Sequence, residues 1–282
     1  MNRRHFLATS TQIAAAGSVL AAAPALAQTA APAATATSAA PSAAPAAKRI
    51  VFVVSNEVNP GPAGFPVGFW LAELAHPFWA FQQRGYQITL ASPNGGRVAH
   101  DNMSDPEGGR FGPPADFLSV GFKRSPRVQS LLEGTKKLSD IKVEDFDSIF
   151  VIGGLGPMLT FADNTQLHKL FAAFYEAGKI STTICHGSVI LLKTRLSNGK
   201  LLAEGKQWTG FCDAEEEIVD KAYNQKVQPF RIEAEAKKIP NTRFVQGAPY
   251  RPFAVRDGLL ISGQQGSSGA RTAELVIQAL EA

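Results

Sequence analysis

Cysteine and charged side chains are scarce in this sequence of 282 residues. Cys185 and Cys212 are the only two cysteines, which argues against a secreted fold held by several disulfides. They also lack the close Cys/His spacing of a zinc site. The sequence leaves open whether the two cysteines form one disulfide with each other. The formal net charge of +4 falls to +2 without Arg3 and Arg4 (4 − 2). This balance indicates neither a nucleic-acid partner nor an anionic surface.

Histidine is also absent from the whole C-terminal part of the chain, because none follows His186. Papain-like proteases, glutamine amidotransferases and α/β-hydrolases carry their catalytic histidine after the nucleophile. The chain also lacks the G-x-S-x-G motif of α/β-hydrolases. These three enzyme classes are therefore excluded.

The N-terminal residues have the pattern of an export signal. Arg3 and Arg4 precede an apolar, alanine-rich run that ends in Ala25-Leu26-Ala27. We expect a signal peptide of the twin-arginine type over residues 1–27, and a periplasmic mature protein. The run is too rich in small residues for a good membrane span, so none is expected in the mature form. Residues 28–48 are mostly Ala, Pro, Thr and Ser, which predicts a disordered linker.

Residues 49–282 alternate between strand and helix patterns, which predicts a single α/β domain. Strands at 49–55 and 86–92 flank a helix over 67–81, where Pro77 should kink the helix or begin a new one. Residues 94–126 lack periodicity and predict a long loop or lid. Further elements are expected at 148–152, 165–177, 180–184, 213–222, near 244, 259–262 and 268–280. This order predicts a doubly wound, mostly parallel, flavodoxin-like sheet with helices on both faces.

Cys185 stands where the predicted strand 180–184 runs into the small-residue start of a helix. That junction lies at the carboxyl edge of the sheet, where open α/β folds bind ligands. Helix amides there would favour a thiolate, so we expect a depressed thiol pKa. The alternative is an inert, buried cysteine. His186 follows directly, and its ring turns either toward the sulfur, toward a third residue, or into an ordinary polar position.

Two further positions are candidates for the same chemistry. Gly154 follows a strand in a glycine-rich run that matches a dinucleotide loop only weakly. Its backbone amide, together with that of His186, could form an oxyanion hole, or the glycines could serve only a tight turn. Glu73 lies in an apolar helix of low charge, where burial would raise its pKa and allow proton exchange with a thiol. A solvated glutamate is the alternative.

Five segments in order resemble the ThiJ/PfpI superfamily, which has a class I glutamine amidotransferase-like fold. The segments are Ala91-Ser-Pro-Asn-Gly-Gly96, Ile152-Gly-Gly-Leu-Gly-Pro157, Ile184-Cys-His-Gly187, Thr209-Gly-Phe-Cys-Asp-Ala-Glu-Glu-Glu217 and Leu260-Ile-Ser-Gly-Gln-Gln-Gly-Ser-Ser268. Glu73-Leu-Ala-His-Pro77 and the Thr209 segment resemble more narrowly the branch of glutathione-independent glyoxalases, of the glyoxalase III type, and related holding chaperones.

The resemblance implies a lyase that converts methylglyoxal to lactate with no added cofactor and no metal. Cys185 would attack the aldehyde, His186 and Glu73 would move protons, and Glu216 would orient the histidine. The neighbouring acids Asp213, Glu215 and Glu217 remain open for that last role. The expected partner is a small aldehyde, and a homodimer is the habit of the family.

Leu155 departs from the pattern, because many members of this branch carry Gly-His-Gly where this chain has Gly154-Leu155-Gly156. If that histidine helps to bind substrate, this chain would have weaker glyoxalase activity or a more apolar substrate. Two alternative functions stay open. One is another ThiJ/PfpI activity, such as isonitrile hydration. The other is a stress-response holding chaperone, suggested by the aromatic stretch Phe65–Phe81.

Overall fold

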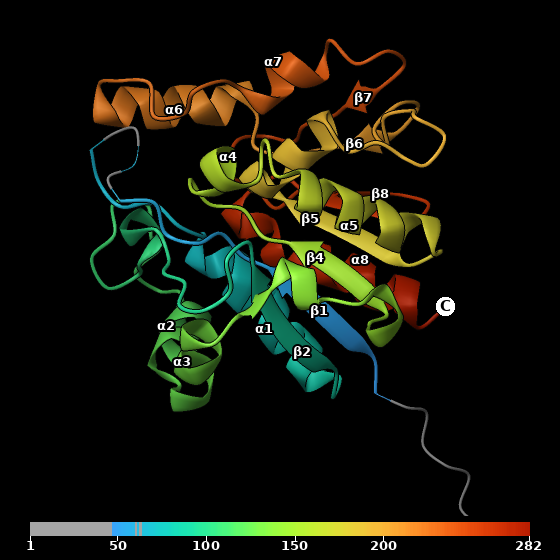
Figure 1. Ribbon diagram of the computed structural model, residues 1–282. Helices are drawn as coiled ribbons and strands as arrows, with labels where there is room; N and C mark the ends of the chain where they lie inside the picture. Colours follow the sequence, from blue (N-terminus) through green and yellow to red (C-terminus); the bar gives the residue numbers. More distant parts are fainter. Residues whose placement is uncertain (1–46, 60, 62–63) are drawn as a thin grey trace, which may run out of the picture. The chain divides into compact units, whose positions relative to one another are not determined.

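The computed structural model describes residues 47–59, 61 and 64–282, so the predicted signal peptide and nearly all of the predicted linker lie outside the described residues. Within them, seven strands form one sheet in the order β3-β2-β1-β4-β5-β9-β8 (Figure 1). Neighbouring strands run parallel except β8, which is antiparallel to β9. The predicted doubly wound, mostly parallel sheet is confirmed, and it forms a single domain.

The elements have the following bounds. The sheet contains β1 (Arg49–Val53), β2 (Gln87–Ser92), β3 (Lys136–Lys137), β4 (Ser148–Val151), β5 (Ile180–Ile184), β8 (Ala254–Asp257) and β9 (Leu260–Gly263), and a separate parallel pair contains β6 (Gln207–Trp208) and β7 (Arg243–Phe244). The helices are α1 (Leu71–Gln83), α2 (Phe117–Arg124), α3 (Pro126–Glu133), α4 (Pro157–Thr160), α5 (Thr165–Glu176), α6 (Asp213–Tyr223), α7 (Ile232–Ala236) and α8 (Gly269–Leu280).

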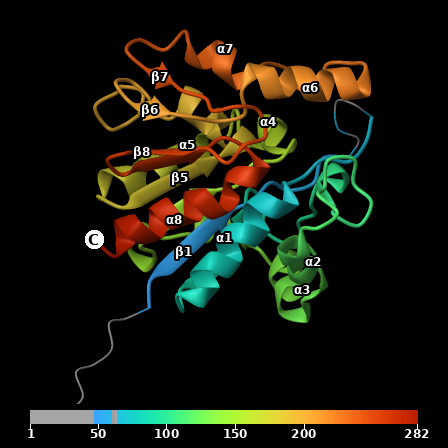
Figure 2. The same cartoon turned by 180° about the vertical axis from the view of Figure 1, so that it is seen from behind.

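Strand β1 shows why helices cover both faces of the sheet. Successive side chains of a strand point to opposite faces, and here both faces carry apolar residues. Ile50 and Phe52 belong to a buried cluster with α1 and α8, which lie side by side in Figure 2. Val51 and Val53 belong to a second cluster with α5. A continuous apolar run therefore becomes a strand buried between two helical layers.

Helix α1 differs from its predicted form in one respect. It runs without interruption from Leu71 to Gln83 with Pro77 inside, so no new helix begins there. Its aromatic side chains belong to the core, since Phe78 and Phe81 are almost fully buried. The apolar stretch that suggested a chaperone surface is therefore largely a core helix.

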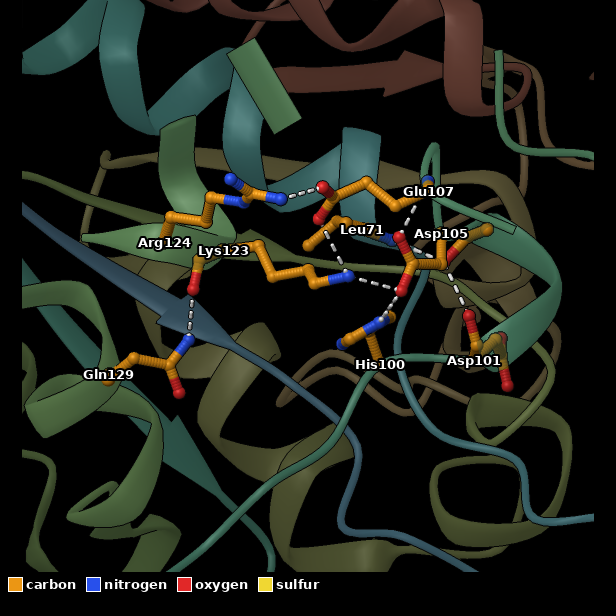
Figure 3. A network of polar contacts seen from close by, with 9 residues as sticks. Leu71, His100, Asp101, Asp105, Glu107, Lys123, Arg124 and Gln129 are labelled. Carbon is orange, nitrogen blue, oxygen red and sulfur yellow. Dashed lines mark hydrogen bonds and ion pairs between the residues drawn. The ribbon is translucent and has the colours of Figure 1, made fainter. Parts of the chain in front are cut away.

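The segment predicted as a loop or lid contains more regular structure than expected. Helix α2 lies within it, and α3 follows directly. Charged side chains join two parts of this segment: Lys123 of α2 contacts Asp105 at 2.5 Å and Glu107 at 3.1 Å (Figure 3). The hydroxyl of Ser104 accepts a hydrogen bond from the backbone N–H of Leu71 at 3.0 Å. The insertion is thus attached to the first turn of α1.

Candidate active site

Cys185 lies at a sharp turn at the carboxyl end of β5, near the middle of the sheet. Its φ of 55° is in the left-handed region, which side-chain-bearing residues rarely adopt and which is frequent at functional sites. A 3-10 helix begins at Cys185 itself and runs to Leu192. A Cβ at Gly187 would lie 2.7 Å from the carbonyl oxygen of Val151, so the turn packs directly against β4. The sequence prediction of a strand-to-helix turn at Cys185 is confirmed.

His186 joins the thiol to a carboxylate. Its Nδ1 lies 3.5 Å from Sγ of Cys185, and its Nε2 lies 2.9 Å from Oε1 of Glu216 on α6. Both the imidazole and the carboxylate are almost completely buried. A carboxylate can only accept, so the hydrogen of the neutral ring sits on Nε2 and the lone pair of Nδ1 faces the thiol. The ring of Phe211 packs on the imidazole at 4.4 Å between centroids and holds its plane.

Glu73 brings a second carboxyl group to the sulfur. Its side chain is fully buried on α1 and adjoins the Cys185 thiol. Oε2 accepts a hydrogen bond from the N–H of Gly153 at 3.0 Å, whereas Oε1 has no hydrogen-bond partner among the described residues. Burial raises the pKa of the Glu73 carboxyl to about 8, so it is protonated at neutral pH. A protonated buried carboxyl with a free oxygen is suited to donate and accept a proton.

Two backbone amides point at the same sulfur. The N–H groups of Gly154 and His186 both lie within hydrogen-bonding reach of the Cys185 thiol. Gly154 has φ of +114°, and a Cβ there would lie 2.4 Å from the backbone nitrogen of Trp70. Only glycine therefore fits this close approach. Amides in this arrangement can stabilise the negative oxygen that forms when the sulfur attacks a carbonyl.

The expected depression of the Cys185 pKa is wrong. Burial raises the pKa of the thiol well above its ordinary value, and so does the Glu73 carboxyl, which is ionised above about pH 8. Together they outweigh the two backbone amides. The resting site consequently holds a thiol, and a base has to remove its proton during reaction.

These groups form part of the wall of a cavity of about 750 Å³. Glu73 and His76 face it from α1, one helical turn apart. The remaining wall is mostly apolar and comes from the insertion, the loop after β4, helix α6 and the loops near the C-terminus. It includes Trp70, Met103, Phe111, Leu155, Phe211, Ile218, Val219 and Tyr250.

The sequence of this domain matches a known family over most of its length. Residues 67–266 match the profile of the DJ-1/PfpI family. The chain belongs to the DJ-1/PfpI family. The ThiJ/PfpI resemblance seen in the sequence is therefore confirmed.

Two curated relatives narrow the position within the DJ-1/PfpI family. Glyoxalase 3 of Candida albicans is 30% identical over 225 residues, which cover 77% of this chain and 92% of that protein. The glutathione-independent glyoxalase HSP31 of Saccharomyces cerevisiae is 26% identical over 226 residues, covering 77% and 91%. The crystal structure of Candida albicans glyoxalase III superposes with a TM-score of 0.69 at 27% identity, covering 82% of this chain and 97% of that one.

A bacterial structure shares the DJ-1/PfpI fold as well. The Rapid Encystment Protein 24 KDa of Francisella tularensis superposes with a TM-score of 0.74 at 24% identity, covering 83% of this chain and 99% of that chain. At this identity the likeness concerns the fold alone.

The structure brings together every DJ-1/PfpI site residue that the sequence suggested: Cys185, His186, Glu73, Glu216 and the Gly154 amide. The structure also shows which acid of α6 contacts His186, a question that the sequence left open.

Among these acids, Glu216 alone contacts His186. Glu215 accepts the backbone N–H of Tyr250 at 2.8 Å and so holds a loop beside the cavity. Glu217 pairs with Arg231 at 3.2 Å, with most of its side chain exposed. Successive residues of a helix point in different directions, which is why only one of three adjacent glutamates reaches the imidazole.

Asp101 is a buried acid beside the site that was not predicted from the sequence. Its Oδ1 accepts the N–H of Gly68 and its Oδ2 accepts the N–H of Leu155, each at 2.7 Å. Burial raises the pKa of this carboxyl to about 7. Leu155 follows Gly154, so Asp101 positions the loop that carries the Gly154 amide. Its place in an aperiodic, Gly/Pro/Asp-rich segment gave no signal of burial.

Cys212 is not part of the reactive group. Both cysteines are free thiols, and Cys212 is fully buried beside Glu215, with burial raising its pKa to about 12. In the part of the chain that the structure describes, no cluster of three or more His, Cys, Asp or Glu side chains is placed to hold a metal ion. None of the described helices is long and apolar enough to span a membrane.

Proposed function

We propose that the protein is a glutathione-independent glyoxalase, a lyase that converts 2-oxoaldehydes such as methylglyoxal to 2-hydroxy acids such as lactate. One observation carries the proposal: the thiol of Cys185 adjoins both an imidazole held by Glu216 and the protonated carboxyl of Glu73. The reaction needs one nucleophile and two proton carriers, which this group supplies. The glyoxalases among its relatives support the same conclusion.

The first half of the reaction forms a hemithioacetal and rearranges it. His186 takes the thiol proton through Nδ1 while the sulfur bonds to the aldehyde carbon, and the carbonyl oxygen takes the proton of Glu73. The Glu73 carboxylate then removes the hydrogen from that carbon. The electron pair forms the carbon–carbon double bond of an enediol, and the former ketone oxygen receives the proton held by His186.

The second half releases the acid and restores the enzyme. His186 takes the proton from the oxygen on the sulfur-bearing carbon, and Glu73 protonates the neighbouring carbon, which yields a thioester of the 2-hydroxy acid. Water then adds to the thioester and gives a proton to Glu73, while the departing sulfur regains one from His186. The aldehyde carbon is oxidised and the ketone carbon is reduced, so no external redox partner is needed.

Product analysis tests the proposal directly. Purified protein supplied with methylglyoxal and no thiol cofactor should produce lactate, and Cys185→Ala should abolish that activity. Cys212→Ala is the matched control, because the second thiol lies outside the reacting group. Lactate formation that survives in a folded Cys185→Ala protein would overturn the assignment of the nucleophile, and no lactate from the wild type would overturn the function.

The location of the enzyme is proposed from the sequence alone. The Arg3-Arg4 pair and the Ala25-Leu26-Ala27 end support export through the twin-arginine route to the periplasm. Protein recovered from the periplasm should have an intact mass that begins near Gln28. A mass that retains Arg3 and Arg4 would contradict cleavage.

A further inference from the structure

The active-site cavity is much larger than the smallest substrate of the proposed reaction. Its volume is about 750 Å³. A three-carbon oxoaldehyde such as methylglyoxal occupies roughly 100 Å³, about as much as three or four water molecules at ~30 Å³ each. Cavities of ~300–1,000 Å³ commonly enclose ligands of drug size. Most of the space beside Cys185 is therefore left over when methylglyoxal binds.

Several polar side chains in the cavity wall already have partners. Nε2 of His76 lies 2.9 and 3.0 Å from the two carboxylate oxygens of Asp116. Gln265 donates to the carbonyl of Arg251 at 2.7 Å, and Ser267 donates to the carbonyl of Tyr250 at 2.9 Å. These groups lie outside the reacting group and are already hydrogen-bonded within the protein. They therefore offer few hydrogen bonds to a substrate that carries several hydroxyls.

The apolar part of the wall begins at the reacting atoms and reaches the surface. Leu155 directly follows Gly154, whose amide faces the sulfur, and Leu155 lines the cavity. Val219 and Ile218 continue this wall on α6, close to Glu216 in sequence. Ile218 and Tyr250 both line the cavity and are 43% and 37% exposed, which places them at its opening. A hydrocarbon chain can thus extend from the sulfur toward solvent along apolar side chains.

We propose that this site selects 2-oxoaldehydes, R–CO–CHO, in which R is a hydrocarbon group of about five to eight carbons, over methylglyoxal. The inference rests on the proposed function, because the bond from Sγ of Cys185 to the aldehyde carbon places R only two carbons away. R then has to occupy the remaining cavity. Each methylene removed from water improves binding roughly fourfold, so a longer R gains affinity until it reaches the opening.

An alkyl series separates this selectivity from the reactivity of the carbonyl groups. Methylglyoxal and hexylglyoxal carry similar alkyl substituents on the dicarbonyl unit, so a difference in kcat/KM reports on the cavity. We expect kcat/KM for hexylglyoxal to exceed that for methylglyoxal at least tenfold. Equal values, or a preference for methylglyoxal, would overturn the selectivity and leave the glyoxalase function standing. Turnover of neither would refute the proposed function, and the selectivity with it.

Variants at exposed apolar positions test whether the wall causes the preference. Ile218→Asn places an amide at the opening and, at a position 43% exposed, leaves folding intact. It should lower the ratio of kcat/KM for hexylglyoxal over methylglyoxal at least threefold. Leu159→Asn is the matched control, since Leu159 is 38% exposed and lies outside the cavity wall, and it should leave the ratio unchanged. A ratio that is the same in the Ile218→Asn and Leu159→Asn proteins would overturn the proposal.

Discussion

Replacement of Glu73 by glutamine separates the catalytic use of this carboxyl from its structural role. In the wild type the group is buried and protonated at neutral pH. One oxygen accepts a hydrogen bond from Gly153, and the other has no hydrogen-bond partner within the described part of the chain. Glutamine has nearly the same shape and can still accept the Gly153 hydrogen bond. It cannot release and recover a proton, so turnover of methylglyoxal should fall about a hundredfold or more.

The same substitution should stabilise the fold near neutral pH. The pKa of Glu73 rises from 4.5 in the unfolded chain to about 8 in the folded protein. At pH 7 the carboxyl must therefore take up a proton on folding, which costs about 3 kcal/mol at ~1.36 kcal/mol per pKa unit. Because the folded state binds the extra proton, this cost is absent below about pH 4.5 and grows until about pH 8. Because glutamine takes up no proton on folding, Glu73→Gln should raise the free energy of unfolding at pH 7 by up to about 3 kcal/mol.

Two measurements on one protein check this reasoning. Free energies of unfolding from urea titrations at pH 5 and pH 8 should show that the gain from Glu73→Gln increases with pH, while kcat falls at both. Glu133→Gln, at an exposed position on α3, should change neither quantity by more than about 0.5 kcal/mol or twofold. Unchanged turnover in a well-folded Glu73→Gln protein would remove this residue from the mechanism. A stability difference independent of pH would refute its buried, protonated state.

Two other substitutions and one labelling experiment test the remaining parts of the site. Glu216→Gln should reduce kcat at least tenfold, because it weakens the orientation and charge stabilisation of the imidazole. Glu217→Gln, a substitution at the exposed neighbouring residue, should keep full activity. Equal kcat values in the two variants would contradict the assignment of Glu216. Asp101→Asn leaves one of the two backbone amides that Asp101 binds, those of Gly68 and Leu155, without an acceptor. The free energy of unfolding should therefore drop by about 1–3 kcal/mol, and kcat should fall with it. Full stability in denaturant titrations would disprove this role of Asp101. Iodoacetamide should reach Cys185 through the cavity and label it before Cys212, as mass spectrometry of the adducts can show. The rate of Cys185 labelling should rise with pH above 8. Labelling that is faster at mildly acidic pH than at pH 8 would show that the pKa of the Cys185 thiol is depressed.

Local pattern was sufficient to predict most of the sheet. The run 180–184 matches β5 residue for residue, because a buried parallel strand needs continuous apolar or β-branched residues and is recognisable by them. Helices α5, α6 and α8 also lie where the 3.6-residue periodicity placed them. The insertion was harder, since α2 spans eight residues that include a glycine and packs through few side chains.

The sequence by itself determined which residues are candidates for the chemistry. Cys185 and His186 are adjacent in the chain, and a glycine-rich turn after a strand is a local feature. The environment of those residues was decided only by tertiary structure. Whether Glu216 or a neighbour reaches the imidazole depends on the rotation of α6 against the sheet. The thiol pKa depends on burial and on Glu73, which is more than a hundred residues away in sequence. Desolvation and charge proximity arise from packing in three dimensions, so no local pattern encodes them.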